Sequence, residues 1–303
     1  MKNNLTPKIE LLGPGLLDQN RAIVTEIKKV AASMGIDLGW HYLLDLSWMI
    51  AQLQPRPGLK VMDAGAGIGL MQWYLSGKGV DVISVDRASR AGMPLHFRAH
   101  YPVCGLRSQD LWPAGQVMVQ NFKNDPSFTH KGVGLARDVV WTLMSGLYKK
   151  AAGRVSVYNQ DLSDLAEVPD GALDAVVSVS ALEHNPPEDL GKVVAELMRV
   201  LRPGGVLLAT LGAAPDRDWF HQPSHGWCYT DGSLMRLFSL PVEAATSNYD
   251  QYGSLFASLV DCVELRDHLA GFYYRSGDNG MPWGKWDPQY LPVGICKIKE
   301  GQP

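Results

Sequence analysis

Short, nearly uninterrupted apolar runs alternate with segments of helical periodicity through the middle of this 303-residue chain. Such runs are typical of parallel strands buried on both faces, and the segments between them are typical of helices that cover a sheet. The alternation predicts an α/β fold with a doubly wound, mostly parallel sheet. The predicted strands are residues 59–62, 82–86, 154–158, 173–179 and 206–210.

Apolar residues three or four positions apart predict helices on both sides of these strands. Residues 1–56 are expected to form an N-terminal helical cap, and residues 57–303 the main domain. Residues 91–131 lack a steady period, so an irregular insertion is expected after the second strand. The predicted helices are residues 19–32, 45–53, 133–150, 189–201 and 231–240.

Three glycines at every second position follow the first predicted strand, in the run Asp63-Ala64-Gly65-Ala66-Gly67-Ile68-Gly69. Glycine has no Cβ, so the backbone can turn sharply there and approach a ligand closely. The helix that follows presents free N–H groups at its start. The next predicted strand ends in Asp86, where a carboxylate could accept hydrogen bonds from ribose hydroxyls. This unit predicts a nucleoside-binding site.

The glycine spacing favours one class of nucleoside over another. A dinucleotide site has the spacing G-x-G-x-x-G, whereas this loop has G-x-G-x-G preceded by Asp63. A carboxylate at the turn would repel a pyrophosphate but could attract a cationic amino acid. At this loop the chain resembles the class I methyltransferases that use S-adenosylmethionine, whose first motif has this form.

Further motifs of the resemblance follow in the order expected for that family, over about residues 58–212. They are Asp161-Leu162 after the third strand, Leu182-Glu183-His184 after the fourth, and Arg202-Pro203-Gly204-Gly205 before the fifth. Gly204 is expected to close the preceding helix in a left-handed conformation. The resemblance implies a Rossmann-like sheet of seven strands with an antiparallel last strand. Residues 260–263 and 291–297 are expected to supply its final antiparallel pair.

The resemblance also implies a cofactor, S-adenosylmethionine, and the residues that bind it. The loop with Asp63 would hold the methionine end, Asp86 the ribose and Asp161 the adenine, while Leu162 would pack on the ring. Ser180 would contribute its backbone at the end of the fourth strand. The full set of predicted cofactor-binding residues is Asp63, Gly65, Ala66, Gly67, Asp86, Arg87, Asp161, Leu162 and Ser180.

Aromatic and histidine side chains near the expected cleft are candidates for binding the methyl acceptor, with packing among themselves as the alternative. They are Trp40, Tyr42, His221, Trp227 and Tyr229. His184 and His225 are candidate general bases because imidazole titrates near neutral pH. His184 could equally brace its loop. Pairs of histidines four apart lack a carboxylate partner, so no metal site is expected.

The composition restricts the chemical class of the methyl acceptor. A net charge of −3, no basic tail and no Asn-Pro-Pro-Tyr-like tetrad after the fourth strand argue against a nucleic acid partner. A small molecule is expected instead, methylated at a heteroatom such as a hydroxyl oxygen, with a sugar or polysaccharide intermediate as one candidate. The four dispersed cysteines and the lack of a membrane-spanning apolar run favour a cytoplasmic protein. A non-catalytic partner subunit and a nicotinamide-dependent oxidoreductase remain alternatives, and the oligomeric state is open.

Overall fold

The computed structural model describes residues 5–125, 128–145, 153–268 and 286–301. The chain divides into two units, which we call unit 1 and unit 2. Unit 1 comprises residues 1–54 and 165–303, and unit 2 comprises residues 55–164. The sequence predicts a domain boundary at residue 56. That boundary stays a prediction, because the two units are defined by contacts within the fold and do not test it.

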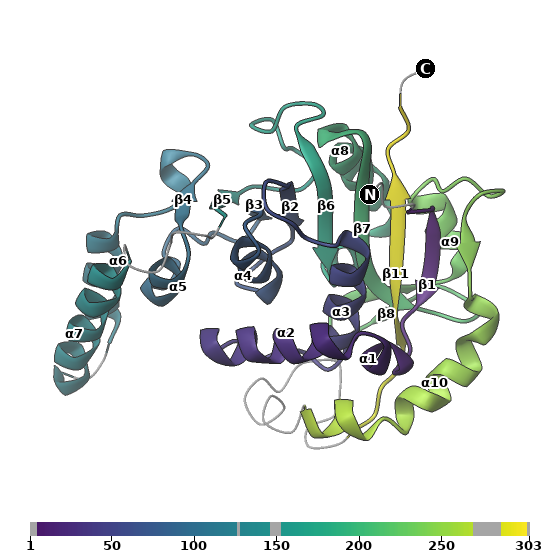
Figure 1. The fold of residues 1–303 in the computed structure, drawn as a ribbon, viewed down its shortest axis with the longest axis horizontal. Helices are drawn as coiled ribbons and strands as arrows, with labels where there is room; N and C mark the ends of the chain where they lie inside the picture. The colour runs from purple at the N-terminus through teal and green to yellow at the C-terminus, as the bar shows by residue number, and fades with distance from the viewer. Residues whose placement is uncertain (1–4, 126–127, 146–152, 269–285, 302–303) are drawn as a thin grey trace. The chain divides into compact units, whose positions relative to one another are not determined.

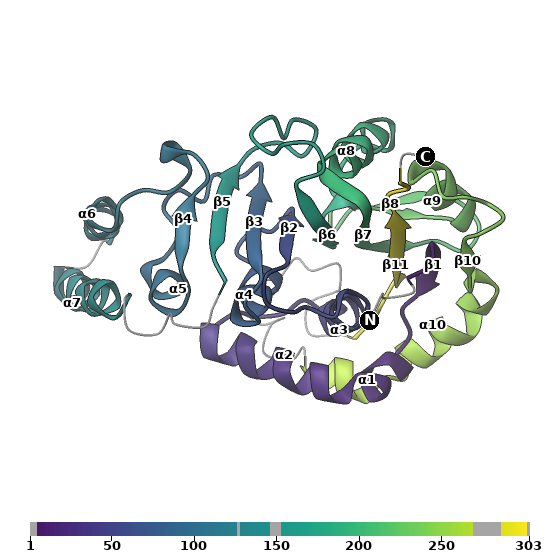
Figure 2. The ribbon, with the colours of Figure 1, turned by 45° about the horizontal axis from the view of Figure 1, so that its top comes forward.

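The described part of unit 2 is built on a parallel sheet in the strand order β2-β3-β5-β4 (Figure 2). Its strands are β2 (Lys60–Ala64), β3 (Asp81–Asp86), β4 (Val103–Gly105) and β5 (Val155–Asn159). Apolar side chains of β2, β3 and β5, such as Val61, Val82 and Val157, are fully buried. Helix α4 (Leu70–Gly77) follows the glycine loop and packs on β3, as the sequence predicts.

Residues 91–131 are not irregular as expected, whereas the prediction that they form an insertion stays a prediction. The segment forms α5 (Leu95–His100), β4, the 3-10 turn η1 (Ser108–Asp110) and α6 (Ala114–Asn124). These elements are short, so the sequence carries too few turns of any one period to reveal them. Strand β4 adds to the edge of the parallel sheet beside β5.

Helix α7 (Phe128–Met144) is present where a helix is predicted, but its apolar face does not lie in a core. Val133 is 72% exposed, Val140 51% and Leu143 74%. The helix packs on α5 and α6 instead (Figure 1). The end of the predicted helix, beyond residue 145, lies outside the described residues.

The described part of unit 1 holds a second group of strands, in the order β10-β1-β11-β7-β6, with β9 beside β7 and β8 beside β9. Figure 1 shows β6, β7, β11 and β1 side by side. The strands β6 and β7 are parallel, and β11 runs antiparallel to β7, which confirms the antiparallel last strand. The bounds are β1 (Lys8–Leu11), β6 (Leu173–Val179), β7 (Leu201–Ala213), β8 (Trp219–His221), β9 (Gly226–Tyr229), β10 (Thr246–Ser247) and β11 (Leu291–Ile298).

Three details of the predicted sheet are wrong. The described residues form eleven strands rather than seven, because the short strands add to the expected set. Strand β1 lies within the segment expected to be a helical cap, and it pairs with β11. Residues 260–263 do not form a strand: α10 (Tyr252–Val260) ends there, and a further helical segment begins at Val263. Four-residue alternations are too short to separate the two periods.

The helices of unit 1 include the predicted helices of the cap and of the middle of the chain, with shifted ends. Trp48 of α3 packs against β11, where a Cβ on Gly294 would lie 2.6 Å from its ring, so glycine is required for this approach. The bounds are α1 (Gly15–Gln19), α2 (Arg21–Met34), α3 (Tyr42–Leu53), η2 (Leu182–His184), α8 (Pro187–Val200), α9 (Asp231–Leu237) and η3 (Tyr249–Gln251).

The Arg202–Gly205 turn differs from the expected helix cap. Helix α8 ends with Leu201 already extended, at φ −71° and ψ 139°. Gly204 does adopt a left-handed conformation, with φ 72°, but it does so within β7. There its N–H donates to Lys299 O at 2.8 Å, so the turn joins β7 to the end of the chain rather than closing the helix.

Within the described residues, each helix is too short or too polar to cross a lipid bilayer.

Candidate functional site

The glycine loop of unit 2 takes the tight conformation that its sequence predicts. Gly65 has φ 76° and Gly67 has φ 48°, in the left-handed region where a side chain is strained. The N–H groups of Gly65 and Ala66 both donate to Val85 O at 2.9 Å. These bonds attach the loop to the end of β3.

Two buried side chains that the sequence analysis did not single out hold the loop from within the unit. Gln72 Nε2 donates to Gly67 O at 3.2 Å and to Gly69 O at 3.1 Å. Arg90 Nη1 donates to Gly67 O at 3.1 Å, and Arg90 Nη2 donates to Tyr158 O at the same distance. The loop carbonyls are therefore fixed in place. A single buried arginine does not change the hydrophobic periodicity of the sequence. Its position shortly after Asp86 was therefore the only feature that could have predicted its contact with the loop.

Asp86 closes the loop from the other side. Its Oδ2 accepts a hydrogen bond from Gly67 N at 2.8 Å, and its Oδ1 accepts one from Ala88 N at 2.8 Å. A carboxylate has about four acceptor positions, so each oxygen can still accept from a ligand hydroxyl. The geometry is compatible with the predicted contact to a ribose.

Asp63 lies deeper than a ligand-binding carboxylate is expected to lie. It is 2% exposed, at the end of β2. Burial raises the pKa of Asp63 to about 7, although the positive charge of Arg90 works in the opposite direction. Its predicted contact with the methionine end of the cofactor stays a prediction.

The residues after β5 gather beside the end of β3. Gln160 N donates to Asp86 O at 2.9 Å, which brings the Asp161-Leu162 pair to this edge of the sheet. Asp161 is exposed and accepts hydrogen bonds from the hydroxyl and the N–H of Ser163, which lower its pKa together with the charge of Arg87. Leu162 is 9% exposed. Unit 2 thus brings together eight of the nine predicted cofactor residues, Ser180 being the exception.

Unit 1 contains a separate small cavity at the carboxyl ends of β6 and β7, which we call the β6–β7 pocket. Its volume is about 140 Å³. Aromatic rings and polar groups make up most of its wall. The lining residues are Gly39, Trp40, His41, Tyr42, Ser180, Glu183, His184, Gly212, Ser224, Gly226, Trp227, Cys228 and Tyr290.

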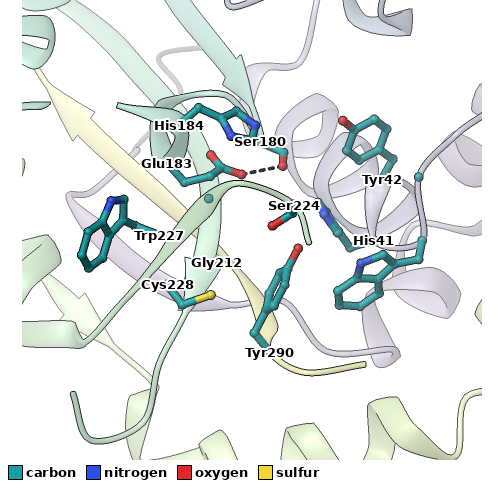
Figure 3. Close-up of a pocket in the computed structure, with 13 residues that line it drawn as sticks. His41, Tyr42, Ser180, Glu183, His184, Gly212, Ser224, Trp227, Cys228 and Tyr290 are labelled. Carbon is teal, nitrogen blue, oxygen red and sulfur yellow. Dashed lines mark hydrogen bonds between the residues drawn. The ribbon is translucent and has the colours of Figure 1, made fainter. Parts of the chain in front are cut away.

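Glu183 is the charged side chain most deeply placed in this wall. It is 6% exposed, and its Oε1 accepts a hydrogen bond from Ser180 Oγ at 2.5 Å (Figure 3). Its Oε2 is buried and has no hydrogen-bond partner among the described residues. The indole Nε1 of Trp40 is buried and unpartnered in the same sense. Burial raises the pKa of Glu183, against the effect of His184, Ser180 and His41.

A buried histidine–carboxylate pair stands at the other side of the pocket. His41 Nδ1 and Asp45 Oδ2 are 2.5 Å apart, and Asp45 is fully buried at the start of α3. Burial alone would lower the pKa of His41, but the charges of Asp45 and Glu183 and the hydrogen bond to Asp45 outweigh it and leave the pKa raised. Figure 3 shows Glu183, His41 and Tyr290 approaching one space from different segments of the chain.

The two histidines predicted as general bases lie at the surface. His184 is exposed and its Nδ1 bonds the carbonyl oxygen of His225 at 2.9 Å, so it braces the loop. His225 is also exposed and has φ 51°. Neither carries a buried partner that would orient it as a base. A catalytic role for either stays a prediction.

The other predicted residues of unit 1 lie in or behind the pocket wall. Trp40, Tyr42 and Trp227 line it, as does Ser180, whose φ of 47° marks a strained backbone at the end of β6. His221 lies behind the wall and shares a 2.7 Å hydrogen bond with Ser224 Oγ. Tyr229 is fully buried and is not among the lining residues.

Comparisons with known proteins agree with this fold. A family model described as a methyltransferase domain matches residues 140–209. The chain resembles the solved structure of Haemonchus contortus phosphoethanolamine N-methyltransferase 2, with TM-score 0.50 and 13% identity, covering 95% of this chain and 60% of that one. The Burkholderia thailandensis 1,6-didemethyltoxoflavin-N1-methyltransferase gives TM-score 0.44 and 14% identity, covering 95% of this chain and 88% of that one. No curated protein matches the chain.

The domain match over residues 140–209 and the shared fold support a class I S-adenosylmethionine-dependent methyltransferase. Its mixed α/β architecture is Rossmann-like, which is the fold of the solved methyltransferase structure that it resembles. The matched segment includes the three later motifs of the resemblance, which begin at Asp161, Leu182 and Arg202, and it lies outside the glycine loop.

Proposed function

We propose that this methyltransferase transfers a methyl group to a hydroxyl oxygen of a small polar molecule, such as a sugar or a polysaccharide intermediate, bound in the β6–β7 pocket. The observation that supports this best is a pair of buried polar atoms on the pocket wall that have no hydrogen-bond partner in the part of the chain that the structure describes. One is an acceptor, Glu183 Oε2, and the other is a donor, Trp40 Nε1–H.

A hydroxyl group can satisfy both atoms, because it donates one hydrogen bond and accepts others. A buried polar group without a partner costs about 1–3 kcal/mol, so a ligand that supplies the missing bonds recovers that cost on binding. The cavity of about 140 Å³ accommodates one small molecule or the end of a larger one. Both features favour a compact hydroxylated acceptor.

The cofactor residues that we propose are those of the glycine loop, with Asp86 for the ribose and Asp161 for the adenine. The open acceptor positions of Asp86 support its part, as does the Gly67 backbone, which is strained for any other residue. When bound, S-adenosylmethionine supplies a methyl group on a positively charged sulfur. The protein then needs mainly to align the acceptor and exclude water, and good alignment can supply about 7–11 kcal/mol of the barrier.

We propose a cytoplasmic enzyme that acts without a nucleic acid partner. All four cysteines are free, which is typical of a reducing compartment. The net charge of −3 gives no general attraction to phosphate backbones.

A second candidate function, methylation of an amine nitrogen, is favoured by a different observation. The carboxyls of Glu183 and Asp45 each carry a buried oxygen without a partner among the described residues. An ammonium group would be attracted to two carboxylates, although it offers no acceptor to the Trp40 indole.

A panel of matched alcohols and amines tests the proposal. The purified full chain is incubated with S-adenosylmethionine and with monosaccharides, polyols and phenols, each beside the amine that replaces its hydroxyl. Formation of S-adenosylhomocysteine and the mass of the methylated product are measured. We expect methylation of the alcohols and not of their amine partners. Methylation confined to amines would favour the second candidate, and methylation confined to tRNA or protein pools would contradict both.

A further inference from the structure

We infer that Glu183 is the general base of the reaction, and that its Oε2 takes the proton of the acceptor hydroxyl as the oxygen is methylated. The inference rests on the proposed function, since an oxygen acceptor must lose its proton. Sequence analysis pointed to the neighbouring histidine. In the folded chain both residues line the pocket, but Glu183 is buried whereas His184 is exposed.

Glu183 is held in one orientation. Ser180 Oγ donates to Glu183 Oε1 at 2.5 Å, and Ser180 is itself fixed because its N–H donates to both oxygens of Thr210 at 3.1 Å. Gly226 of β9 packs against the glutamate stem, where an added Cβ would lie 3.0 Å from Glu183 Cγ. One carboxylate oxygen is thus occupied, and the other is left for a ligand.

The other titratable groups at the pocket suit this role less well. The His41 ring holds its Nδ1 against Asp45, and its pKa is raised by the charges of Asp45 and Glu183 despite burial. A raised pKa favours the protonated ring, which has no free lone pair to accept another proton. The ring can, however, offset the negative charge of Glu183, as a positioning residue.

The proposed step balances in atoms and charge. A lone pair of the acceptor oxygen forms the new C–O bond, and the S–C bond electrons return to the sulfur. The hydroxyl proton moves to Glu183 Oε2, so the sulfonium charge and the carboxylate charge disappear together. The proton leaves to solvent when the methylated product leaves.

The surroundings of Glu183 raise its pKa above the ordinary value of a glutamate. Burial raises the pKa of Glu183, which is the direction that strengthens a carboxylate as a base. His184 and His41 oppose this shift. The further titratable groups that the Glu183 charge reaches are Tyr42, Cys228, Tyr229 and Tyr290.

The test compares Glu183→Gln with Glu243→Gln, a matched change at an exposed loop position. The alcohols that the wild-type chain methylates serve as acceptors, and kcat is measured from pH 5 to 9. We expect Glu183→Gln to lower kcat by about 10²- to 10⁴-fold and to remove the rise of activity with pH, with cofactor affinity and circular dichroism unchanged. Glu243→Gln should behave as wild type. Carbon NMR of labelled glutamate in the cofactor-free protein should show one carboxyl titrating above the usual range, absent in Glu183→Gln.

The possible outcomes distinguish a failure of the proposed base, Glu183, from a failure of the proposed function, alcohol methylation. If the alcohols are methylated but Glu183→Gln keeps kcat within about threefold and an unchanged pH profile, the inference is overturned and the proposed function stands. A Glu183 carboxyl that titrates in the ordinary range would also overturn it. If no alcohol is methylated although the cofactor binds, the proposed function fails first and the inference falls with it.

Discussion

The glycine loop of unit 2 and the β6–β7 pocket of unit 1 differ in how their buried polar atoms are satisfied. In the loop, the carbonyl of Gly67 accepts from Gln72 and Arg90, and its N–H donates to Asp86, all without a ligand. In the pocket, Glu183 Oε2 and Trp40 Nε1 have no partner among the described residues. The loop is completed by the chain itself, whereas the pocket needs a ligand to complete it.

This difference predicts which property a substitution changes in each region: stability in the loop, and ligand binding in the pocket. A self-satisfied network should respond to substitution mainly in stability and cofactor affinity. An unsatisfied pocket should respond mainly in acceptor turnover, as the Glu183 test above expects.

The largest effect is expected from Arg90→Leu. The substitution removes the hydrogen bonds to Gly67 O and Tyr158 O and leaves the buried Asp63 without its nearest positive charge. We expect the free energy of unfolding, measured in urea, to fall by about 3–5 kcal/mol. Arg87→Leu, at an exposed position three residues earlier, should change it by less than about 0.5 kcal/mol. Equal losses of unfolding free energy in the two variants would contradict the stabilising role of the Arg90 hydrogen bonds.

The buried carboxyl of Asp63 should make stability depend on pH. Its pKa is raised to about 7 in the folded chain, against about 3.9 in an unfolded one. Between these values the folded state holds the extra proton, so the stability that Asp63 contributes is greatest below pH 4 and falls as the pH rises to 7. The full loss is about 4 kcal/mol.

Asp63→Asn provides the control for this dependence of stability on pH. The amide does not titrate, so the variant should lack this part of the fall when urea unfolding is repeated from pH 4 to 8. A wild-type stability that rises across this window by the same amount as in Asp63→Asn would show that Asp63 is ionised in the folded chain.

A moderate effect is expected from Asp86→Asn. The substitution removes the charge that accepts from Gly67 N and Ala88 N and that we propose accepts from the ribose. We expect the Kd for S-adenosylhomocysteine, measured by calorimetry, to rise about 10- to 10²-fold, since a hydrogen bond to a charged group contributes about 1.5–3 kcal/mol. Asp81→Asn, at the opposite end of β3, should leave the Kd unchanged. A matching loss there would indicate damage to the strand rather than to the site.

The smallest effect is expected from Leu143→Gln on α7. The side chain is 74% exposed, so the free energy of unfolding should change by less than about 0.5 kcal/mol. Leu190→Ala, at a fully buried position of α8, should cost about 2–5 kcal/mol in the same urea assay. A comparable loss in Leu143→Gln would mean that α7 packs its apolar face in a core after all.

The sequence predicted well those elements whose conformation is determined by neighbouring residues in the chain. The glycine loop, the main strands and helix α8 follow from residues next to one another in the chain. The face of α7 did not, because helical periodicity is the same whether an apolar stripe meets a core or solvent. Strand β1 was missed because four alternating residues gain their meaning only from pairing with β11, nearly 300 residues away.

The site divides in the same way. Asp86 could be predicted because a strand end fixes its position, whereas the Arg90 side chain reaches the loop only after folding. At the end of β6, Glu183 and His184 are adjacent in the chain, and the 3-10 turn η2 leaves the first buried and the second exposed. No spacing rule in the sequence distinguishes them. A buried partner, such as Ser180 for Glu183, is visible only in three dimensions.

The central claim, that this chain is a methyltransferase that binds S-adenosylmethionine, is tested most directly by calorimetric titration of the full wild-type chain with S-adenosylmethionine, S-adenosylhomocysteine and NADH. We predict saturable one-site binding of both adenosyl ligands and no heat from NADH. Binding of NADH alone would contradict the account by making the glycine loop a dinucleotide site. Silence from all three ligands in folded protein would contradict it in favour of a non-catalytic partner subunit.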